Sequence, residues 1–378
     1  MMQQWVHFDA DSDDPSPVEY SRRLAAAAAR AGDTADKYGE GDLIATAERL
    51  IATRLGKERA VLFATGTLAN MVALDRLCPR DARRVLVHPD SHIFSDTGDG
   101  AAATMGLTLV TVPADGAGFT AAAALQVIAA ARTGKVRQGV GAAVVETPVR
   151  RYSNAMFPLA ELDRVTAQLR AQGVALHLDG ARLPIAAASA QRRIDEFAAP
   201  FDCVYLSLWK MLGLPFGAAL AGTAALLDGT EHDRRRIGGA LPQLWPLAVM
   251  VLAHLDARLG SWPQVFAHFG EFCSQLERLG RFTLTPIGSE PTNTVWLDAG
   301  SLDPATLRAC AREQGLVLPE PQGKRFAIRA NMGWLAQTPQ ELLARLDRAA
   351  DHAGTARAAP NPANRPPTKH SAMLPPDM

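Results

Sequence analysis

The stretch Val174-Ala175-Leu176-His177-Leu178-Asp179-Gly180-Ala181-Arg182 decides the fold class of this chain. Its first half is short and apolar, as expected of a β-strand that is buried on both faces of a sheet. Asp179 follows at once, and a carboxylate at the rim of a core needs a partner that stabilises its charge. The alternative is that Asp179 caps a helix beginning near Ala181, because aspartate is favoured at that position.

Strand and helix patterns alternate on both sides of this stretch. Short apolar runs indicate strands at 60–63, 84–88, 107–112, 141–146, 203–207 and 218–222. Helical spacing lies between several of them, as at 121–132 and 158–172. Buried strands that alternate with helices predict an α/β protein with a mostly parallel sheet and helices on both faces.

The chain is long enough for a large domain and a smaller one. A compact α+β pattern near the C-terminus predicts strands at 294–297 and 326–329 and helices at 304–313 and 339–349. We therefore expect four parts along the chain. They are an N-terminal arm and helix over 1–30, a large domain over 31–259, a smaller C-terminal domain over 260–352 and a disordered, Pro- and Ala-rich tail over 353–378.

Composition argues against several classes of protein. Lys and Arg number 39 and Asp and Glu number 39, so no net charge attracts nucleic acid or an acidic membrane. The four cysteines are far apart and form no C-x-x-C pair, which predicts reduced thiols and no metal site. No secretory signal is visible, and the longest apolar run, 247–255, is too short to span a bilayer. We expect a cytoplasmic protein that binds a small molecule.

Two further polar motifs also follow predicted strands. Lys210 comes just after the strand at 203–207, where partial desolvation favours the neutral amine that forms a Schiff base. Thr65-Gly66-Thr67 stands between a strand and a helix, and a helix N-terminus can bind a phosphate. Each motif alone is weak, because a surface lysine or a threonine N-cap gives the same pattern. Ligands of open α/β sheets bind at the carboxyl ends of strands, so these motifs and Asp179 together indicate one site.

With these motifs in this order, the sequence resembles the threonine aldolase and β-eliminating lyase family. The string from His177 to Leu183 is its most specific part, and the resemblance covers residues 30–350. It implies the aspartate-aminotransferase-like fold, a homodimer or homotetramer, and pyridoxal phosphate (PLP) as cofactor. Lys210 would carry the cofactor, and Asp179 would pair with its pyridinium nitrogen so that the ring accepts electrons.

The resemblance also implies roles for individual residues. His92 would stack on the cofactor ring, Arg182 would bond its phenolic oxygen, and Ser207 would help to hold the phosphate. The implied cofactor-binding set is Thr65, Gly66, Thr67, His92, Asp179, Arg182, Ser207 and Lys210, of which Lys210, His92 and Asp179 would be catalytic. Arg329 would clamp the substrate carboxylate with its two-pronged guanidinium, and Tyr38 would bind the substrate as well. The alternatives are a loop histidine at His92 and a surface ion pair at Arg329.

The sequence departs from the family in two segments. The family's aldolases carry Glu-Asn-Thr-His where this chain has Glu146-Thr147-Pro148-Val149, so Val149 replaces a candidate acceptor of the β-hydroxyl proton. We expect Val149 to face the substrate's β-carbon unless Pro148 turns the backbone. Arg150 and Arg151 follow, and this basic loop either binds an acidic substrate group or is a solvated face. The second departure is Pro242, where the family tends to have arginine.

The implied reaction is cleavage of the Cα–Cβ bond of a β-hydroxy-α-amino acid, which gives glycine and an aldehyde. One alternative is β-elimination, which starts from loss of the Cα proton and releases ammonia and a keto acid. Another is a protein that binds PLP without turnover. The intact Arg329 favours an enzyme, because this is the residue that recognises an amino-acid substrate.

Overall fold

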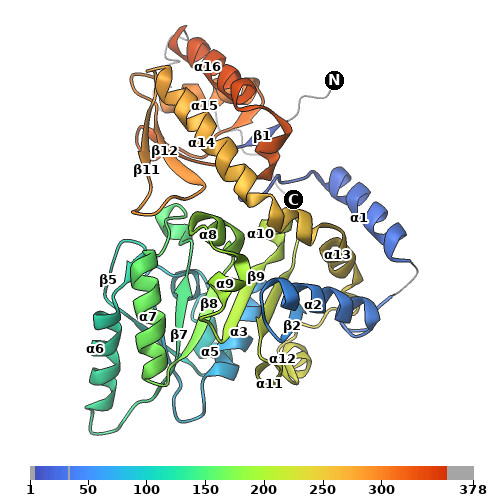
Figure 1. Ribbon diagram of the computed structural model, residues 1–378, viewed down its shortest axis with the longest axis vertical. Coiled ribbons are helices and arrows are strands. Elements are labelled where there is room, and N and C mark those ends of the chain that lie inside the picture. Colours follow the sequence, from blue (N-terminus) through green and yellow to red (C-terminus); the bar gives the residue numbers. More distant parts are fainter. Residues whose placement is uncertain (1–4, 33–34, 356–378) are drawn as a thin grey trace, which may run out of the picture.

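The computed structural model describes residues 5–32 and 35–355. A large α/β domain and a smaller domain are joined by two long helices, α13 (Trp245–Gly260) and α14 (Trp262–Arg278) (Figure 1). The boundary expected at 259/260 falls where α13 ends. Among the described residues, no helix combines the length and the apolar character needed to cross a membrane.

A seven-stranded sheet forms the centre of the large domain, in the order β2-β10-β9-β8-β7-β3-β4. Its strands are β2 (Arg59–Phe63), β3 (Arg84–Val87), β4 (Thr108–Thr111), β7 (Val140–Glu146), β8 (Ala175–Gly180), β9 (Cys203–Ser207) and β10 (Ala218–Gly222). Five neighbouring strands, from β9 to β4, pair in parallel, and only β10 runs antiparallel to its neighbours. The predicted mostly parallel sheet is confirmed.

Helices cover both faces of the sheet because successive strand residues point to opposite sides. In β9, Val204 and Leu206 join the larger core, whereas Cys203 and Tyr205 join the other. The larger core also contains residues of α2 (Asp42–Arg54), α7 (Leu159–Ala171), α8 (Leu183–Ser189) and α13. The opposite core contains residues of α3 (Gly66–Leu77) and α5 (Gly100–Met105). Further elements of this domain are α4 (His92–Ser95), β5 (Ala114–Asp115), β6 (Gly118–Phe119), α6 (Ala121–Arg132), η1 (Arg150–Tyr152), α9 (Ile194–Ala198), α10 (Leu208–Leu212), α11 (Ala224–Leu227) and α12 (Thr230–Arg236).

The small domain has an antiparallel sheet in the order β11-β12-β14, packed with helices. Its elements are β11 (Thr283–Pro286), β12 (Thr294–Asp298), α15 (Pro304–Glu313), β13 (Leu316–Val317), β14 (Arg325–Arg329), η2 (Met332–Ala336) and α16 (Pro339–Thr355). Because α16 continues to Thr355, the prediction of a disordered tail from 353 is wrong for residues 353–355. The rest of the predicted tail lies outside the described residues.

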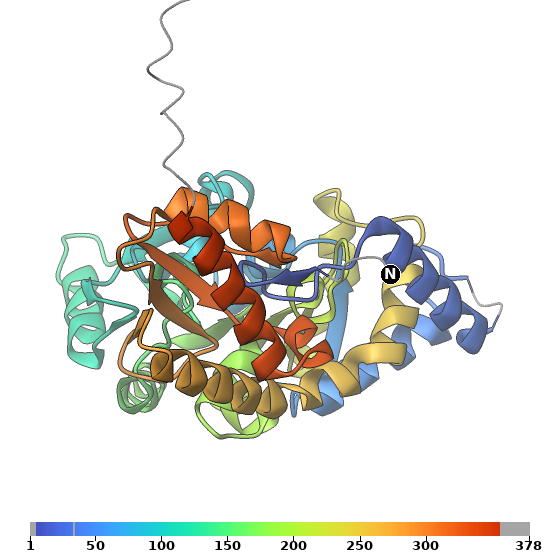
Figure 2. The same ribbon diagram turned by 90° about the horizontal axis from the view of Figure 1, so that it is seen from above.

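The N-terminal segment belongs to the small domain rather than standing apart as an irregular arm. Strand β1 (Val6–His7) pairs in parallel with β13, and Phe8 stacks on Trp334 with ring centroids 4.1 Å apart. Seen from above, this blue segment lies beside the orange and red elements of the small domain before the chain turns outward into α1 (Pro17–Ala31) (Figure 2). The segment therefore crosses the junction of the two domains, and we refer to residues 5–14 as the arm.

Candidate active site

Asp179 lies at the carboxyl end of β8 and is buried. The side-chain amide of Asn70 donates to its Oδ2 at 3.1 Å, and the backbone N–H of Ala181 donates to its Oδ1 at 3.3 Å. His177, also buried, contacts the amide oxygen of Asn70 at 2.8 Å and so fixes the orientation of that amide. Burial raises the pKa of Asp179, although Lys210 and Arg182 nearby oppose the shift. A further cation beside this carboxylate would stabilise its charge.

Lys210 lies in the short helix α10, directly after β9, as its predicted place after the strand at 203–207 requires. The hydroxyl of Ser207 caps this helix by accepting from the backbone N–H of Lys210 at 3.4 Å. Burial, and after it the charge of Arg182, lowers the pKa of Lys210 to about 8. An amine with this pKa is neutral in a substantial fraction of molecules near pH 7–8, as an imine-forming lysine needs to be.

A carboxylate of the arm joins the two arginines of the predicted site. Asp11 accepts from Nη2 of Arg182 at 2.6 Å and from Nη1 of Arg329 at 3.3 Å. The Nε atoms of both arginines are buried and have no hydrogen-bond partner among the described residues. Asp11 was not among the residues expected at the site, and the acidic run at 9–14 is the only sequence feature that marks it.

His92 begins α4, and two carboxylates hold it. Its backbone N–H donates to Glu146 at 2.6 Å, and its Nδ1 lies 3.2 Å from Asp96. Arg150 and Arg151 both donate to Asp96, at 2.8 and 2.7 Å, while their side chains remain 48% and 42% exposed. Asp96 was not among the expected residues either, although its spacing of four from His92 is that of neighbours on a helix.

Val149 follows β7, and its backbone carbonyl accepts from the backbone N–H of Asn154, whose side chain donates to Asp11 at 3.4 Å. That Val149 faces the substrate's β-carbon stays a prediction. The side chain of Val149 is buried in a small apolar cluster with Ala117, Ala155 and Ile287. The backbone N–H of Val149 donates to the carbonyl of Ala155 at 2.8 Å, which closes a tight loop after β7. A histidine at this position would have the apolar side chains of Ala117, Ala155 and Ile287 as neighbours.

The predicted phosphate site lies at the N-terminus of α3. Thr65 caps this helix through the backbone N–H of Leu68, and Gly66 and Thr67 form its first turn. A Cβ at Gly66 would collide with the Tyr205 hydroxyl, which accounts for the glycine. The ring of Tyr38, which was expected to bind the substrate, stacks on Arg235, 4.3 Å from the guanidinium carbon.

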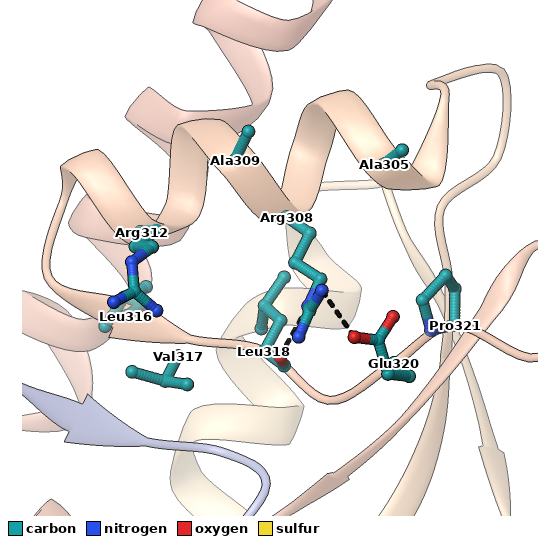
Figure 3. Close-up of a pocket in the computed structure, with 9 residues that line it drawn as sticks. All are labelled: Ala305, Arg308, Ala309, Arg312, Leu316, Val317, Leu318, Glu320 and Pro321. Atoms are coloured by element: carbon teal, nitrogen blue, oxygen red, sulfur yellow. Dashed lines mark hydrogen bonds and ion pairs between the residues drawn. The ribbon is translucent and has the colours of Figure 1, made fainter. Parts of the chain in front are cut away.

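A separate hollow on the small domain does not contain the predicted residues (Figure 3). It lies between α15 and residues 316–321 and has a volume of about 250 Å³. Arg308 crosses it and pairs with Glu320 at 2.7 Å. The candidate active site is therefore the junction formed by Asp179, Lys210 and the arginines, not this hollow.

PLP, which the sequence resemblance implies, fits the residues at the junction. Lys210 supplies an amine that is easily neutralised, and it lies near enough to Asp179 for each charge to influence the other. The buried carboxylate of Asp179 suits a pyridinium nitrogen, and the unpaired Nε of Arg182 suits the phenolic oxygen. The N-terminus of α3 suits a phosphate.

Comparisons with known proteins point the same way. The sequence signature of a family described as β-eliminating lyase matches residues 11–320. The low specificity L-threonine aldolase of Saccharomyces cerevisiae is 26% identical over 293 residues, which cover 75% of this chain and 72% of that protein. A solved structure from Exiguobacterium, described as an aromatic amino acid β-eliminating lyase/threonine aldolase, is 26% identical with a TM-score of 0.77 over 93% of this chain and 98% of that one. A structure described as an L-allo-threonine aldolase from Listeria monocytogenes, also 26% identical, has a TM-score of 0.76 over 92% of this chain and 96% of that one.

Proposed function

Because the chain belongs to the β-eliminating lyase family, we propose that it is a PLP-dependent lyase acting on a β-hydroxy-α-amino acid. The products are glycine and an aldehyde. The observation that carries this proposal is that the neighbouring parallel strands β8 and β9 bring Asp179, Arg182 and Lys210 to one edge of the sheet. The threonine aldolases among the similar proteins support the choice of substrate class.

In this proposal each residue at the junction has one task toward the cofactor. Lys210 binds it covalently, Asp179 holds the proton on its ring nitrogen, and Arg182 donates to its phenolic oxygen. Thr65, Gly66, Thr67 and Ser207 hold its phosphate, and His92 stacks on the ring. When bound, the cofactor supplies a ring that accepts the electron pair of the bond broken at the substrate's α-carbon.

Toward the substrate, Arg329 binds the carboxylate and thereby fixes the orientation of the α-carbon. His92 is the residue of this chain that takes the proton of the β-hydroxyl, since the side chain of Val149 has no group that accepts a proton. Asp96 holds the imidazole through Nδ1 and leaves Nε2 for that transfer. A positioned base of this kind typically contributes about 10²- to 10⁴-fold to the rate.

The second candidate is β-elimination. The lowered pKa of Lys210 favours β-elimination, because this reaction needs a base that removes the Cα proton and the neutral amine can be that base. Incubating the purified, PLP-loaded protein with a panel of amino acids and identifying the products by mass separates the candidates. Glycine and an aldehyde support cleavage, whereas ammonia and a keto acid support elimination. A protein that binds amino acids without any product is the non-catalytic alternative.

Arg329→Lys should weaken substrate binding and leave cofactor binding normal. Lysine keeps the charge but loses the forked pair of donors, and losing one charge-assisted hydrogen bond corresponds to an increase in KM of about 10- to 100-fold. KM is measured with the best substrate of the panel. Arg325→Lys is the matched control, because Arg325 lies on the same strand but contacts the Trp296 ring. An unchanged KM in Arg329→Lys would move the carboxylate site elsewhere.

The rate at which cofactor-free protein takes up PLP should depend on pH through Lys210. With a pKa of about 8, about one amine in ten is neutral at pH 7 and about nine in ten at pH 9. Because only the neutral amine attacks the aldehyde, the uptake rate should rise about tenfold over that interval and then level off. Stopped-flow absorbance measures it. A rate still climbing above pH 10 contradicts the lowered pKa.

Assembly and location are part of the proposal as well. Phe94, Trp209 and Leu241 are exposed, and the first two lie within two residues of His92 and Lys210. Exposed apolar side chains beside a site are typical of a surface that a second subunit covers. We infer a homodimer or homotetramer, located in the cytoplasm, where the four thiols stay reduced.

A further inference from the structure

We propose that Asp11 is a positioning residue: its carboxylate holds Arg182 and Arg329 so that one edge of each guanidinium stays free for an anionic group. The inference rests on the proposed function in one respect, the assignment of Arg329 to the substrate carboxylate. It adds the arm to the site, although the arm is remote in sequence from every residue assigned so far.

The geometry at Asp11 is that of a bridge between two domains. Arg182 follows β8 in the large domain, and Arg329 ends β14 in the small domain. One oxygen of Asp11 accepts from each: Oδ2 from Nη2 of Arg182 at 2.6 Å, and Oδ1 from Nη1 of Arg329 at 3.3 Å. In both arginines the hydrogen bond to Asp11 uses an Nη atom, so the buried Nε–H remains available to donate to another acceptor. Asp11 thus fixes the guanidinium groups without occupying the donors that the cofactor and substrate need.

The charges at the junction explain why a carboxylate is needed there. Burial, and the neighbouring charge of Arg182, lower the pKa of Arg329, while Asp11 opposes both. Burial also opposes ionisation of Asp11, but Arg182 and Arg329 outweigh it and hold the pKa of Asp11 well below its usual range. Without Asp11, the buried Arg182 and the half-buried Arg329 would lie close together without their shared counter-charge, which is strongly unfavourable. The arginines would then turn away or take up another anion.

The arm is held in place by contacts that do not involve Asp11. The side-chain amide of Asn331 donates to the carbonyls of His7 and Ala10, and the indole N–H of Trp334 also donates to His7. Asp13, two residues after Asp11, pairs with Arg258 at 2.7 Å and with Arg23 at 2.8 Å. Asp13 is therefore a matched control: it is an arm carboxylate between two arginines, and neither arginine belongs to the site.

The test compares Asp11→Ala with Asp13→Ala, both loaded with PLP, in the presence and absence of formate. In Asp11→Ala the KM should rise about tenfold or more, the effect of losing a charge-assisted hydrogen bond, with a smaller change in kcat. Formate should restore KM in a saturable way, because its carboxylate fits between the two arginines. In the wild type formate should only compete with substrate. Asp13→Ala should keep the wild-type KM and show no rescue.

Amino-acid affinity, followed by the absorption change of the bound cofactor, gives a readout that needs no turnover. If Asp11→Ala weakens binding and formate restores it, while the wild type cleaves nothing, the inference stands and the proposed reaction fails. Asp11→Asn is the second variant in case the alanine variant does not fold. Asp11→Asn should show the same loss of amino-acid affinity, and formate should not restore it, because the amide fills the space between the two arginines that formate would occupy. Unchanged amino-acid affinity in these variants overturns the inference. A second contradicting result is that formate raises the thermal midpoint of Asp11→Ala but does not change its amino-acid affinity, because formate would then act on stability alone.

Discussion

Lys210→Ala should lose turnover almost completely, by at least about 10⁴-fold. Lys210 contributes both covalent binding and proton transfer, and a base alone typically contributes about 10²- to 10⁴-fold. Its place after β9 and its lowered pKa support these roles. The measurement is product release under saturating substrate, with the cofactor content of each preparation determined separately.

Lys57→Ala is the matched control for this variant. Lys57 is also partly buried, and burial lowers its pKa as well, but its Nζ donates to the carbonyl of Phe201 at 2.6 Å. Lys57→Ala should retain wild-type turnover. In the wild type, borohydride reduction and peptide mapping should find the pyridoxyl group on residue 210. A pyridoxyl group on any other lysine would refute the assignment of the whole junction.

Asp179→Asn should lower turnover by about 10²- to 10³-fold, the usual effect of removing one preorganised electrostatic contact in an active site. Asparagine keeps the shape of the side chain but cannot hold a proton on the ring nitrogen as a carboxylate does. Lys210 is unchanged, so cofactor content should remain near that of the wild type. The two quantities are measured on the same preparation, turnover by product release and cofactor content by absorbance.

Asp202→Asn serves as the control, because Asp202 contacts the other end of the same strand. Its carboxylate accepts from the backbone N–H of Leu176 at 2.8 Å, near the start of β8. This variant should reduce stability slightly and leave turnover near the wild-type value. If Asp179→Asn turns over like the wild type, Asp179 is only a structural acid that binds Asn70 and the backbone of Ala181.

The local sequence pattern was sufficient to predict the bounds of several helices and strands of this chain. Strands β9 and β10 and helices α6 and α15 have the bounds that the sequence predicted. The two helices begin at side-chain caps, Thr120 and Asp303, so their starts are marked within four residues of sequence. The nearness of Asp179 and Lys210 was also predictable, because parallel neighbouring strands bring their carboxyl ends to one edge.

Only the tertiary structure determines which charged residues pair with one another at that edge of the sheet. Asp11 bonds arginines that lie 171 and 318 residues away, and Asp96 bonds Arg150 from 54 residues away. Such ion pairs produce no periodic pattern in a sequence, since each depends on where two irregular segments lie in the folded protein. The direction of Val149 was undetermined for a similar reason. In a segment without regular structure, the packing of neighbours such as Ala155 and Ile287, rather than a repeat, determines which way a side chain points.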